Sequence, residues 1–516
     1  MKRFPFYPLL LALFPALALL ANNISQVQAW VAVRPLISSL AGGVLLFALS
    51  WLALRSWSRA ALITTLLLAW FFSYGHIYNL LKPVTLLGLA IGRHRLLFPL
   101  LALLFAGLAW LALRSRSDFA SLILPLNVIA SLLVLFQIIT IAGYTIRYST
   151  AAAKPPAPDP AAAGQLKPAN PQQMPDVYYI ILDAYTRQDA LQTYFDFNNQ
   201  AFVDGLKKLG FYVAGCSRAN YTSTELSLSS SLNLDYLPAL SRKFAEGSTD
   251  RSALPELMKH SQLRQQLEAI GYRSVSFQEE FYWVVWDDAD ILMTATASGQ
   301  ALRSLRPFEA MLLRDTAVSF LVDAGSVLFK GWVEQVNFPY ADHVNQVLFM
   351  LDKLDNMASV SGPKLVFAHV LVPHLPFVFN ADGSVQQDEN YYRDSSNPIN
   401  DDYYQKGYTA QIQFINSRIL PILKMIINES RVPPVIILQG DHGVRDFNRP
   451  AILNAYYLPG AAQQLYPTIT PVNTFRLVLD QYFGAHYGLL QDMSYTTPLD
   501  VFRFTPLEED SPDCKK

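Results

Sequence analysis

The chain has 516 residues, of which 52% are hydrophobic and 16% charged, and its formal net charge is −1. Soluble domains carry about 25% charged residues, so this composition indicates that part of the chain lies in lipid. The balanced charge gives no electrostatic reason to expect a nucleic acid partner. The two cysteines, Cys216 and Cys514, are too few for a disulfide framework or a cysteine-based zinc site.

The first part of the chain, residues 1–145, contains five long apolar runs that predict five transmembrane helices. Each run approaches or reaches the ~20 residues that cross the hydrocarbon core of a bilayer. The runs cover residues 5–22, 36–54, 60–81, 95–113 and 119–144. Taken alone, the first run also fits a signal peptide, but four further runs follow at short spacing, so we interpret it as a membrane helix.

The basic residues between the runs predict the orientation of these helices. Those that fall on one side are Lys2, Arg3, Arg55, Arg59, Arg114 and Arg116. The loop between runs three and four, with Lys82 and Arg93, weakly favours the opposite orientation. With the first side assigned as cytoplasmic, the N-terminus lies inside and everything after residue 145 lies outside the cell membrane.

The remainder of the chain predicts a linker and a second domain. Residues 146–175 are rich in Pro and Ala and predict an extended linker without a core. Residues 176–510 predict an α/β domain with a mostly parallel sheet, because buried strands alternate with amphipathic helices. The expected strands are 177–182, 211–214, 364–370, 434–438 and 455–458. The expected helices are 198–209, 224–236, 253–270, 343–359 and 402–427.

Polar side chains follow three of the expected strands. Asp183 comes directly after 177–182, His374 comes after 364–370, and Asp441 and His442 come after 434–438. Because open α/β sheets bind ligands at the carboxyl ends of their strands, we expect these side chains to converge on one crevice. Each alone has an ordinary structural explanation, such as a helix cap or a turn. Together, these oxygen and nitrogen ligands without a thiolate favour zinc or manganese, and a carboxylate-rich site also suits magnesium or calcium.

Residues 219–232 form a hydroxyl-rich turn that runs into an apolar-periodic helix, and this segment contains candidate nucleophiles. A hydroxyl at a helix N-terminus lies near free backbone N–H groups and the positive end of the helix dipole. Both favour an alkoxide and an incoming anionic ester, and a bound dication would lower the pKa of the hydroxyl further. Threonine and serine before a helix are, equally, common caps.

At these residues the chain resembles the alkaline-phosphatase/sulfatase superfamily. In layout it resembles the membrane-anchored, sulfatase-like branch that includes lipoteichoic acid synthases and phosphoethanolamine transferases. This resemblance implies five N-terminal membrane helices, a linker and an external, alkaline-phosphatase-like catalytic domain. It implies that Thr224, in Thr-Glu-Leu-Ser-Leu-Ser, is the nucleophile and also a metal ligand. Thr222 takes that role if the alignment shifts by two residues.

The resemblance also assigns roles to the residues that come after strands. It implies that Asp183 is the first acidic metal ligand and that Asp441 and His442 form the Asp-His ligand pair. His374, in Val-Pro-His-Leu-Pro, matches a segment that contacts substrate or a second metal.

The chain departs from this family in three places. Phosphoethanolamine transferases carry a further His after Asp-His-Gly, and its absence before residue 455 favours a single metal ion. In that stretch Arg445 and Arg449 are candidates to bind the anionic oxygens of the ester, or they are ordinary surface arginines. The disulfides of that group are not expected here. Cys216 lacks the Cys-x-Pro-x-Arg context of formylglycine sulfatases and is expected to be a small buried residue.

The sequence therefore predicts a metal-dependent phosphoester transferase or hydrolase that acts on lipid or glycolipid head groups of the cell envelope. One divalent cation would be bound by Asp183, Thr224, Asp441 and His442. Two alternatives stay open, a sulfuric ester hydrolase that uses the same site and a catalytically silent envelope scaffold. The aromatic and acidic segment 277–290 either shapes the substrate pocket or packs in the core. The head group, the acceptor and the oligomeric state are left open.

Overall fold

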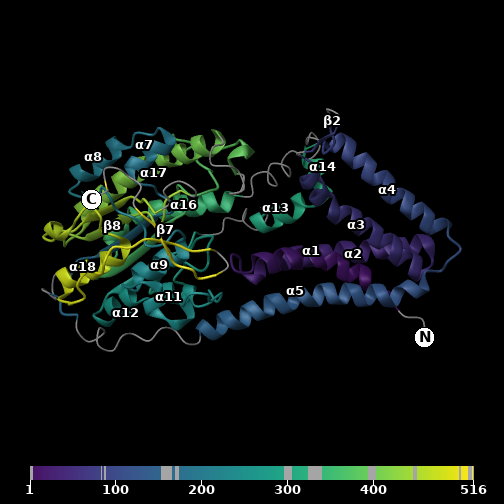
Figure 1. Ribbon diagram of the computed structural model, residues 1–516, viewed down its shortest axis with the longest axis horizontal. Coiled ribbons are helices and arrows are strands. Elements are labelled where there is room, and N and C mark those ends of the chain that lie inside the picture. Colours follow the sequence, from purple (N-terminus) through teal and green to yellow (C-terminus); the bar gives the residue numbers. More distant parts are fainter. Residues whose placement is uncertain are drawn as a thin grey trace. The chain divides into compact units, whose positions relative to one another are not determined.

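The computed structural model describes most of the chain in two units (Figure 1). The described residues are 4–82, 84–86, 89–152, 166–168, 174–295, 305–323, 340–392, 402–444, 450–498, 501–508 and 514. Residues 1–147 and 297–342 cluster in the first unit, and residues 148–296 and 343–516 in the second.

The first unit contains the five expected apolar helices. They are α1 (Tyr7–Asn23), α2 (Val33–Leu54), α3 (Trp57–Leu81), α4 (His94–Arg114) and α5 (Ile123–Ala152). By length and composition, α2 to α5 with their preceding turns can cross a membrane, whereas α1 is a shorter apolar helix of 17 residues. Leucine and isoleucine side chains cover the outer faces of these helices and are exposed, as side chains that face lipid would be. The strands β1 (Thr85–Leu86) and β2 (Leu89–Ala90) pair between α3 and α4.

Two short helices from the later part of the chain also belong to the first unit. They are α13 (Pro307–Arg314) and α14 (Val318–Asp323). Nε of Arg34 forms an ion pair with Oε1 of Glu309 at 3.2 Å. The rings of Phe320 and Phe98 stack with their centroids 4.0 Å apart. The expected domain boundaries at 145 and 175 remain a prediction, but these contacts show that residues well beyond them pack on the apolar helices.

The second unit is built on a mixed sheet of seven strands in the order β4-β9-β8-β3-β7-β5-β6. The strands are β3 (Val177–Leu182), β4 (Tyr212–Val213), β5 (Arg273–Phe277), β6 (Ile291–Met293), β7 (Lys364–Val370), β8 (Val435–Gln439) and β9 (Asn454–Tyr457). The five strands β8, β3, β7, β5 and β6 run parallel, and β9 runs antiparallel to β8 and β4. The predicted fold class, an α/β domain with a mostly parallel sheet, is confirmed.

Helices cover both faces of this sheet. Figure 1 shows α7 (Gln188–Phe195), α8 (Gln200–Lys208) and α17 (Asp402–Glu429) on one side. The other side carries α9 (Thr224–Leu232), α11 (Leu254–Lys259), α12 (Gln262–Ala269) and α18 (Pro471–Phe483). The remaining elements are α10 (Leu237–Leu240), α16 (Ala341–Leu354), β10 (Tyr495–Thr496) and β11 (Thr505–Pro506). All six side chains of β3 are buried, because alternate residues of this central strand face the two helix layers.

The expected helix at 253–270 is divided into α11 and α12. Ser261 adopts an extended backbone conformation, and its side chain accepts a hydrogen bond from the backbone N–H of Arg264. A serine in this role caps the start of a helix, so it begins a new helix inside an otherwise continuous apolar pattern.

The predicted linker contains residues that pack in the second unit. Helix α5 continues to Ala152, and Leu166 is buried in the core beside α18. The backbone N–H of Lys167 donates to the carbonyl of Phe483 at 2.7 Å. Residues 153–165 and 169–173 lie outside the described part of the chain.

The two cysteines form a disulfide, Cys216–Cys514, across 298 residues. The expectations that Cys216 is a small buried residue and that no disulfide forms are therefore wrong, and Cys216 is only partly buried. The spacing gave no sign of the pairing, because only the fold brings the two Cα atoms to 5.5 Å. The bond ties the C-terminal tail to the segment that leads into α9.

Candidate metal centre

Three adjacent strands place polar side chains at one edge of the sheet. Asp183 directly follows the central strand β3, and Asp441 follows its neighbour β8. His369 is the penultimate residue of β7, on the other side of β3, where it is in register with Ile181. Because these strands run parallel, their carboxyl ends bring the three side chains together.

The loop after β8 can approach the loop after β3 because residue 440 is glycine. A Cβ atom on Gly440 would lie 2.4 Å from the carbonyl oxygen of Tyr185, which is closer than atoms can pack. This approach lets Oδ1 of Asp441 accept a hydrogen bond from the backbone N–H of Ala184 at 3.0 Å. The backbone of the site therefore requires a glycine directly before Asp441.

Asp183, His369 and Asp441 form a buried group that could hold a metal ion. One ligand atom from each lies within 4.8 Å of the others, and the three residues are only 1–2% exposed. Among the described residues, Oδ1 of Asp183, Nε2 of His369 and Oδ2 of Asp441 have no hydrogen-bond partner. Buried polar atoms without partners are costly, and carboxylates more so. A divalent cation would satisfy all three, so the donor set fits a metal.

Two further predicted residues, His442 and Thr224, lie beside this group. Nε2 of His442 is 3.6 Å from Oδ1 of Asp183, 3.6 Å from Oδ2 of Asp441 and 3.3 Å from Oγ1 of Thr224. Nδ1 of His442 lies 2.8 Å from the carbonyl of Gly443. That carbonyl can only accept, so Nδ1 carries a hydrogen and Nε2 is the nitrogen that faces the carboxylates.

Thr224 is the first residue of α9 and follows the extended residue Ser223. Its hydroxyl therefore lies at the helix N-terminus, where backbone N–H groups and the helix dipole favour negative charge. The structure thus brings together four predicted residues: Asp183, Thr224, Asp441 and His442.

The remaining predicted residues differ in how the structure places them. The ring centroid of His374 lies 6.2 Å from that of His442, and its Nδ1 lies 2.7 Å from the carbonyl of Leu375. His374 is therefore next to the candidate ligands without being one of the grouped three. Arg445 and Arg449 fall in 445–449, outside the described residues.

Two residues of the site were not found from the sequence, His369 and Glu279. His369 was counted as part of an apolar strand, although a histidine inside a strand buried on both faces is itself a signal. Glu279 comes after β5, which was not among the expected strands. It is 4% exposed, and its Oε2 and Oε1 lie 3.0 and 3.2 Å from Nδ1 of His369. Its signal is its position after β5, and the sequence of that strand did not reveal the strand.

Burial and the neighbouring charges shift the pKa values of Glu279, His369 and Asp441. Burial raises the pKa of the Glu279 carboxyl, and the neighbouring His369 acts in the opposite direction. Burial lowers the pKa of His369, but the carboxylates of Glu279, Asp183 and Asp441 outweigh it and raise that pKa to about 9. Burial also acts to raise the pKa of Asp441, but the two histidines and the hydrogen bonds to this carboxylate lower it overall. The cluster therefore favours positive charge between its carboxylates.

Comparison with solved structures finds phosphoethanolamine transferases and sulfatases. The C-terminal periplasmic domain of EcEptC from Escherichia coli is 10% identical, with a TM-score of 0.40, over 69% of this chain and 96% of that chain. The integral membrane lipooligosaccharide phosphoethanolamine transferase A from Neisseria meningitidis is 11% identical, with a TM-score of 0.37, over 92% of this chain and 96% of that one. A 2-O GAG sulfatase is 11% identical, with a TM-score of 0.38, over 63% and 77% of the two chains.

No family model matches the chain, and no curated protein matches it in sequence. The matched structures named here are at most 11% identical to this chain. Since their TM-scores are 0.40 or lower, a functional conclusion has to come from the residues of this chain.

Proposed function

We propose that the second unit is a metal-dependent phosphoester transferase or hydrolase that acts on lipid or glycolipid head groups. The observation that carries the proposal is the group of unsatisfied buried ligand atoms of Asp183, His369 and Asp441 beside the Thr224 hydroxyl. A silent structural domain has no reason to keep one oxygen of each of two buried carboxylates without a hydrogen bond.

One divalent cation would be held by Asp183, His369 and Asp441, with His442 and Thr224 beside them. Nitrogen and oxygen donors without a thiolate favour zinc or manganese in such a site. When bound, the ion would supply Lewis acidity and lower the pKa of the threonine hydroxyl.

The protein's own residues would then carry out a two-step transfer. Oγ1 of Thr224 forms a bond to phosphorus while the bond from phosphorus to the leaving head-group oxygen breaks, and the hydroxyl proton passes to solvent. The backbone N–H groups at the start of α9 stabilise the negative charge on the phosphoryl oxygens. His374, in its protonated form, donates a proton to the leaving oxygen. Water or an acceptor hydroxyl then attacks the phosphothreonine and releases Thr224.

The apolar helices of the first unit support a substrate that resides in the membrane. A chain with helices able to cross a bilayer keeps its catalytic unit at the membrane surface, where lipid head groups are concentrated. We place the N-terminus in the cytoplasm and the catalytic unit outside, as the distribution of basic residues favours.

The test compares two isosteric variants, Thr224→Val and Thr222→Val, of the full chain in detergent. Each variant is incubated with a bis-aryl phosphodiester and, in parallel, with an aryl sulfate. We expect Thr224→Val to lose turnover of the phosphodiester and Thr222→Val to retain it, because only the former removes the hydroxyl beside His442. Mass spectrometry should detect phosphate on the peptide that contains Thr224 after rapid acid quenching.

Other outcomes would favour the alternatives. Turnover of the sulfate alone would favour a sulfuric ester hydrolase that uses the same site. An active Thr224→Val protein would contradict the proposed nucleophile. A folded protein with neither activity nor bound metal would favour an envelope scaffold.

A further inference from the structure

The imidazole of His369 lies between two carboxylates that contact its two nitrogens. On one side, both oxygens of Glu279 lie within 3.2 Å of Nδ1. On the other side, Nε2 lies 3.7 Å from Oδ2 of Asp183 and has no hydrogen-bond partner among the described residues. Glu279 and His369 are both almost fully buried, so water does not compete for this contact.

An imidazole that binds a metal through one nitrogen keeps a single N–H group on the other, and the partner of that N–H group decides which nitrogen carries the hydrogen. Because the Glu279 carboxylate can only accept, it holds the hydrogen on Nδ1 and leaves the lone pair of Nε2 directed at the gap between Asp183 and Asp441. A carboxylate behind a metal-binding histidine fixes the orientation of the ring and makes the ligand more basic. We propose that Glu279 is a positioning residue that aligns His369 as a ligand of the metal centre. This inference rests on the proposed function.

The residues that lead to Glu279 are fixed by two hydrogen bonds. Before it, Ser276 of β5 accepts a hydrogen bond at Oγ from the backbone N–H of Trp286 at 3.2 Å. Directly before Glu279, the backbone N–H of Gln278 donates to the carbonyl of Met293 in β6 at 2.8 Å. The position of Glu279 is therefore set by the sheet.

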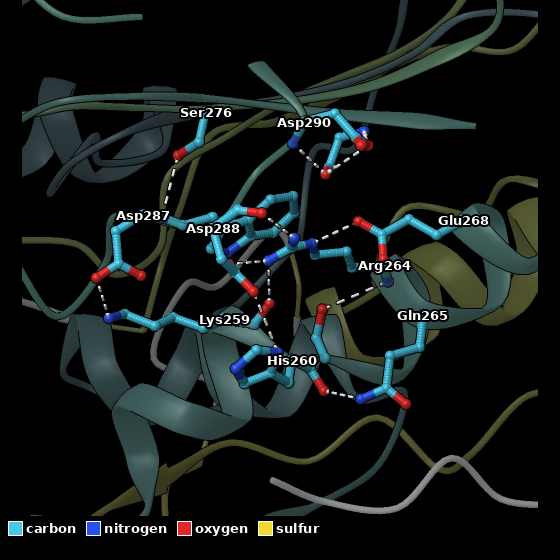
Figure 2. Close-up of polar contacts among 12 residues, drawn as sticks. Lys259, His260, Arg264, Gln265, Glu268, Ser276, Asp287, Asp288 and Asp290 are labelled. Atoms are coloured by element: carbon cyan, nitrogen blue, oxygen red, sulfur yellow. Dashed lines mark hydrogen bonds and ion pairs between the residues drawn. The ribbon is translucent and has the colours of Figure 1, made fainter. Parts of the chain in front are cut away.

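Further along the same segment, a polar cluster holds residues 286–290 (Figure 2). Arg264 of α12 donates from Nη1 to Oδ1 of Asp288 at 2.7 Å, and its guanidinium lies 5.3 Å from the Trp286 ring centroid. Lys259 of α11 pairs with Asp287 at 3.0 Å, and Asp290 accepts hydrogen bonds from Ser274. A residue that supports a metal ligand must itself be held in place. These contacts hold the segment that carries Glu279.

The neighbouring residue provides a matched control. Oε2 of Glu280 lies 3.2 Å from Nδ1 of His343, and His343 is 3% exposed. Glu280–His343 is thus a second carboxylate–imidazole pair on the same segment. His343 is not part of the metal-ligand group found among the described residues.

The experiment measures the affinity of the full chain for zinc by competition with a fluorescent chelator. The variants are Glu279→Leu, Glu279→Gln, His369→Gln, the double variant Glu279→Leu with His369→Gln, and the control Glu280→Leu. Loss of a group that supports a metal ligand costs about 10–100-fold in affinity, which is the loss expected for Glu279→Leu. Glu279→Gln keeps an oxygen that can accept from Nδ1 and should lose less.

The double variant distinguishes a positioning role from a general effect on the fold. If Glu279 acts through His369, adding Glu279→Leu to His369→Gln causes no further loss, and Glu280→Leu binds zinc as the wild type does. Should Glu279→Leu bind as the wild type, or should the two losses multiply in the double variant, the inference is overturned while the metal centre stands. A folded wild-type chain that binds no zinc or manganese would overturn the proposed function and this inference together.

Discussion

Two polar clusters in the α/β unit combine acidic and basic side chains but differ in burial and in how their groups are satisfied, because the carboxylates of the second cluster are partly exposed. The metal-centre cluster consists of Asp183, His369, Asp441 and His442 at the carboxyl edge of the sheet. The Arg264 cluster consists of Lys259, Arg264, Glu268, Asp287 and Asp288 (Figure 2). In the Arg264 cluster all three guanidinium nitrogens donate hydrogen bonds, to Glu268, to Asp288 and to the carbonyl of Lys259. In the metal-centre cluster three ligand atoms have no hydrogen-bond partner among the described residues.

This difference separates a structural role from a functional one. Groups that satisfy one another stabilise the fold and need nothing else. Groups that converge without satisfying one another destabilise the fold unless a ligand completes them. The two clusters should therefore respond to substitution in opposite ways, one in metal content and activity and the other in stability.

The largest effect is expected for Asp441→Asn in the metal-centre cluster. Because even loss of a supporting group costs about 10–100-fold, loss of this ligand should reduce metal affinity and turnover by more than about 100-fold. Asn keeps the oxygen that accepts from the N–H of Ala184, so the melting temperature in a chelator should stay close to that of the wild type. Metal content by mass spectrometry and thermal unfolding check both parts. A large loss of stability with metal retained would erase the distinction between the clusters.

An intermediate effect is expected for Arg264→Ala in the Arg264 cluster. Arg264 is 4% exposed, so the variant loses its hydrogen bonds and its packing on Trp286. We expect the free energy of unfolding to fall by about 2–4 kcal/mol, since partly exposed Asp288 and Glu268 can regain water. At saturating metal, the folded variant should still bind as many ions as the wild type. Thermal unfolding with parallel metal analysis measures both, and wild-type stability would contradict the structural role.

The smallest effect concerns the pH dependence of Asp288. Burial acts to raise the pKa of Asp288, but the hydrogen bond and charge of Arg264 outweigh it and lower the pKa below its ordinary value. A lowered pKa means that ionised Asp288 stabilises the fold above the ordinary aspartate pKa, and that this stability is lost as pH falls through the lowered value. Because the side chain is 48% exposed, the contribution should be under about 1 kcal/mol.

The measurement for Asp288 compares the melting temperatures of wild type and Asp288→Asn between pH 7 and pH 3. The difference should be present at neutral pH and shrink as the pH falls through the lowered pKa, where the wild-type carboxyl becomes protonated as well. A difference that does not change with pH would show that the ionised form makes no contribution.

Much of the sheet and part of the site could be predicted because their signals are local. Strands 177–182 and 364–370 are continuous apolar runs, and the structure forms β3 and β7 over the same residues. The polar residues at the carboxyl ends of the parallel strands could be found in the same way, namely Asp183 after β3 and Asp441 and His442 after β8. Thr224 was identified from a motif and lies at the start of α9, as a hydroxyl at a helix N-terminus should.

The rest could not be predicted because it depends on contacts between distant segments. β5 contains Arg273, Ser274 and Ser276, so its burial comes from neighbouring strands and its sequence shows no apolar run. Glu279 was missed with it. The Cys216–Cys514 bond and the packing of α13 on the apolar helices likewise join segments far apart in the chain. The orientation of the membrane helices and the roles of Arg445 and Arg449 stay predictions.

The most direct test of the central claim is anomalous X-ray diffraction from crystals of the full chain grown with zinc or manganese. The account predicts one strong anomalous peak at about 2.0–2.2 Å from carboxylate oxygens of Asp183 and Asp441 and from Nε2 of His369, with Thr224 adjacent. Well-ordered density for these side chains without an anomalous peak, at saturating metal, would contradict the metal centre and the proposed function that rests on it.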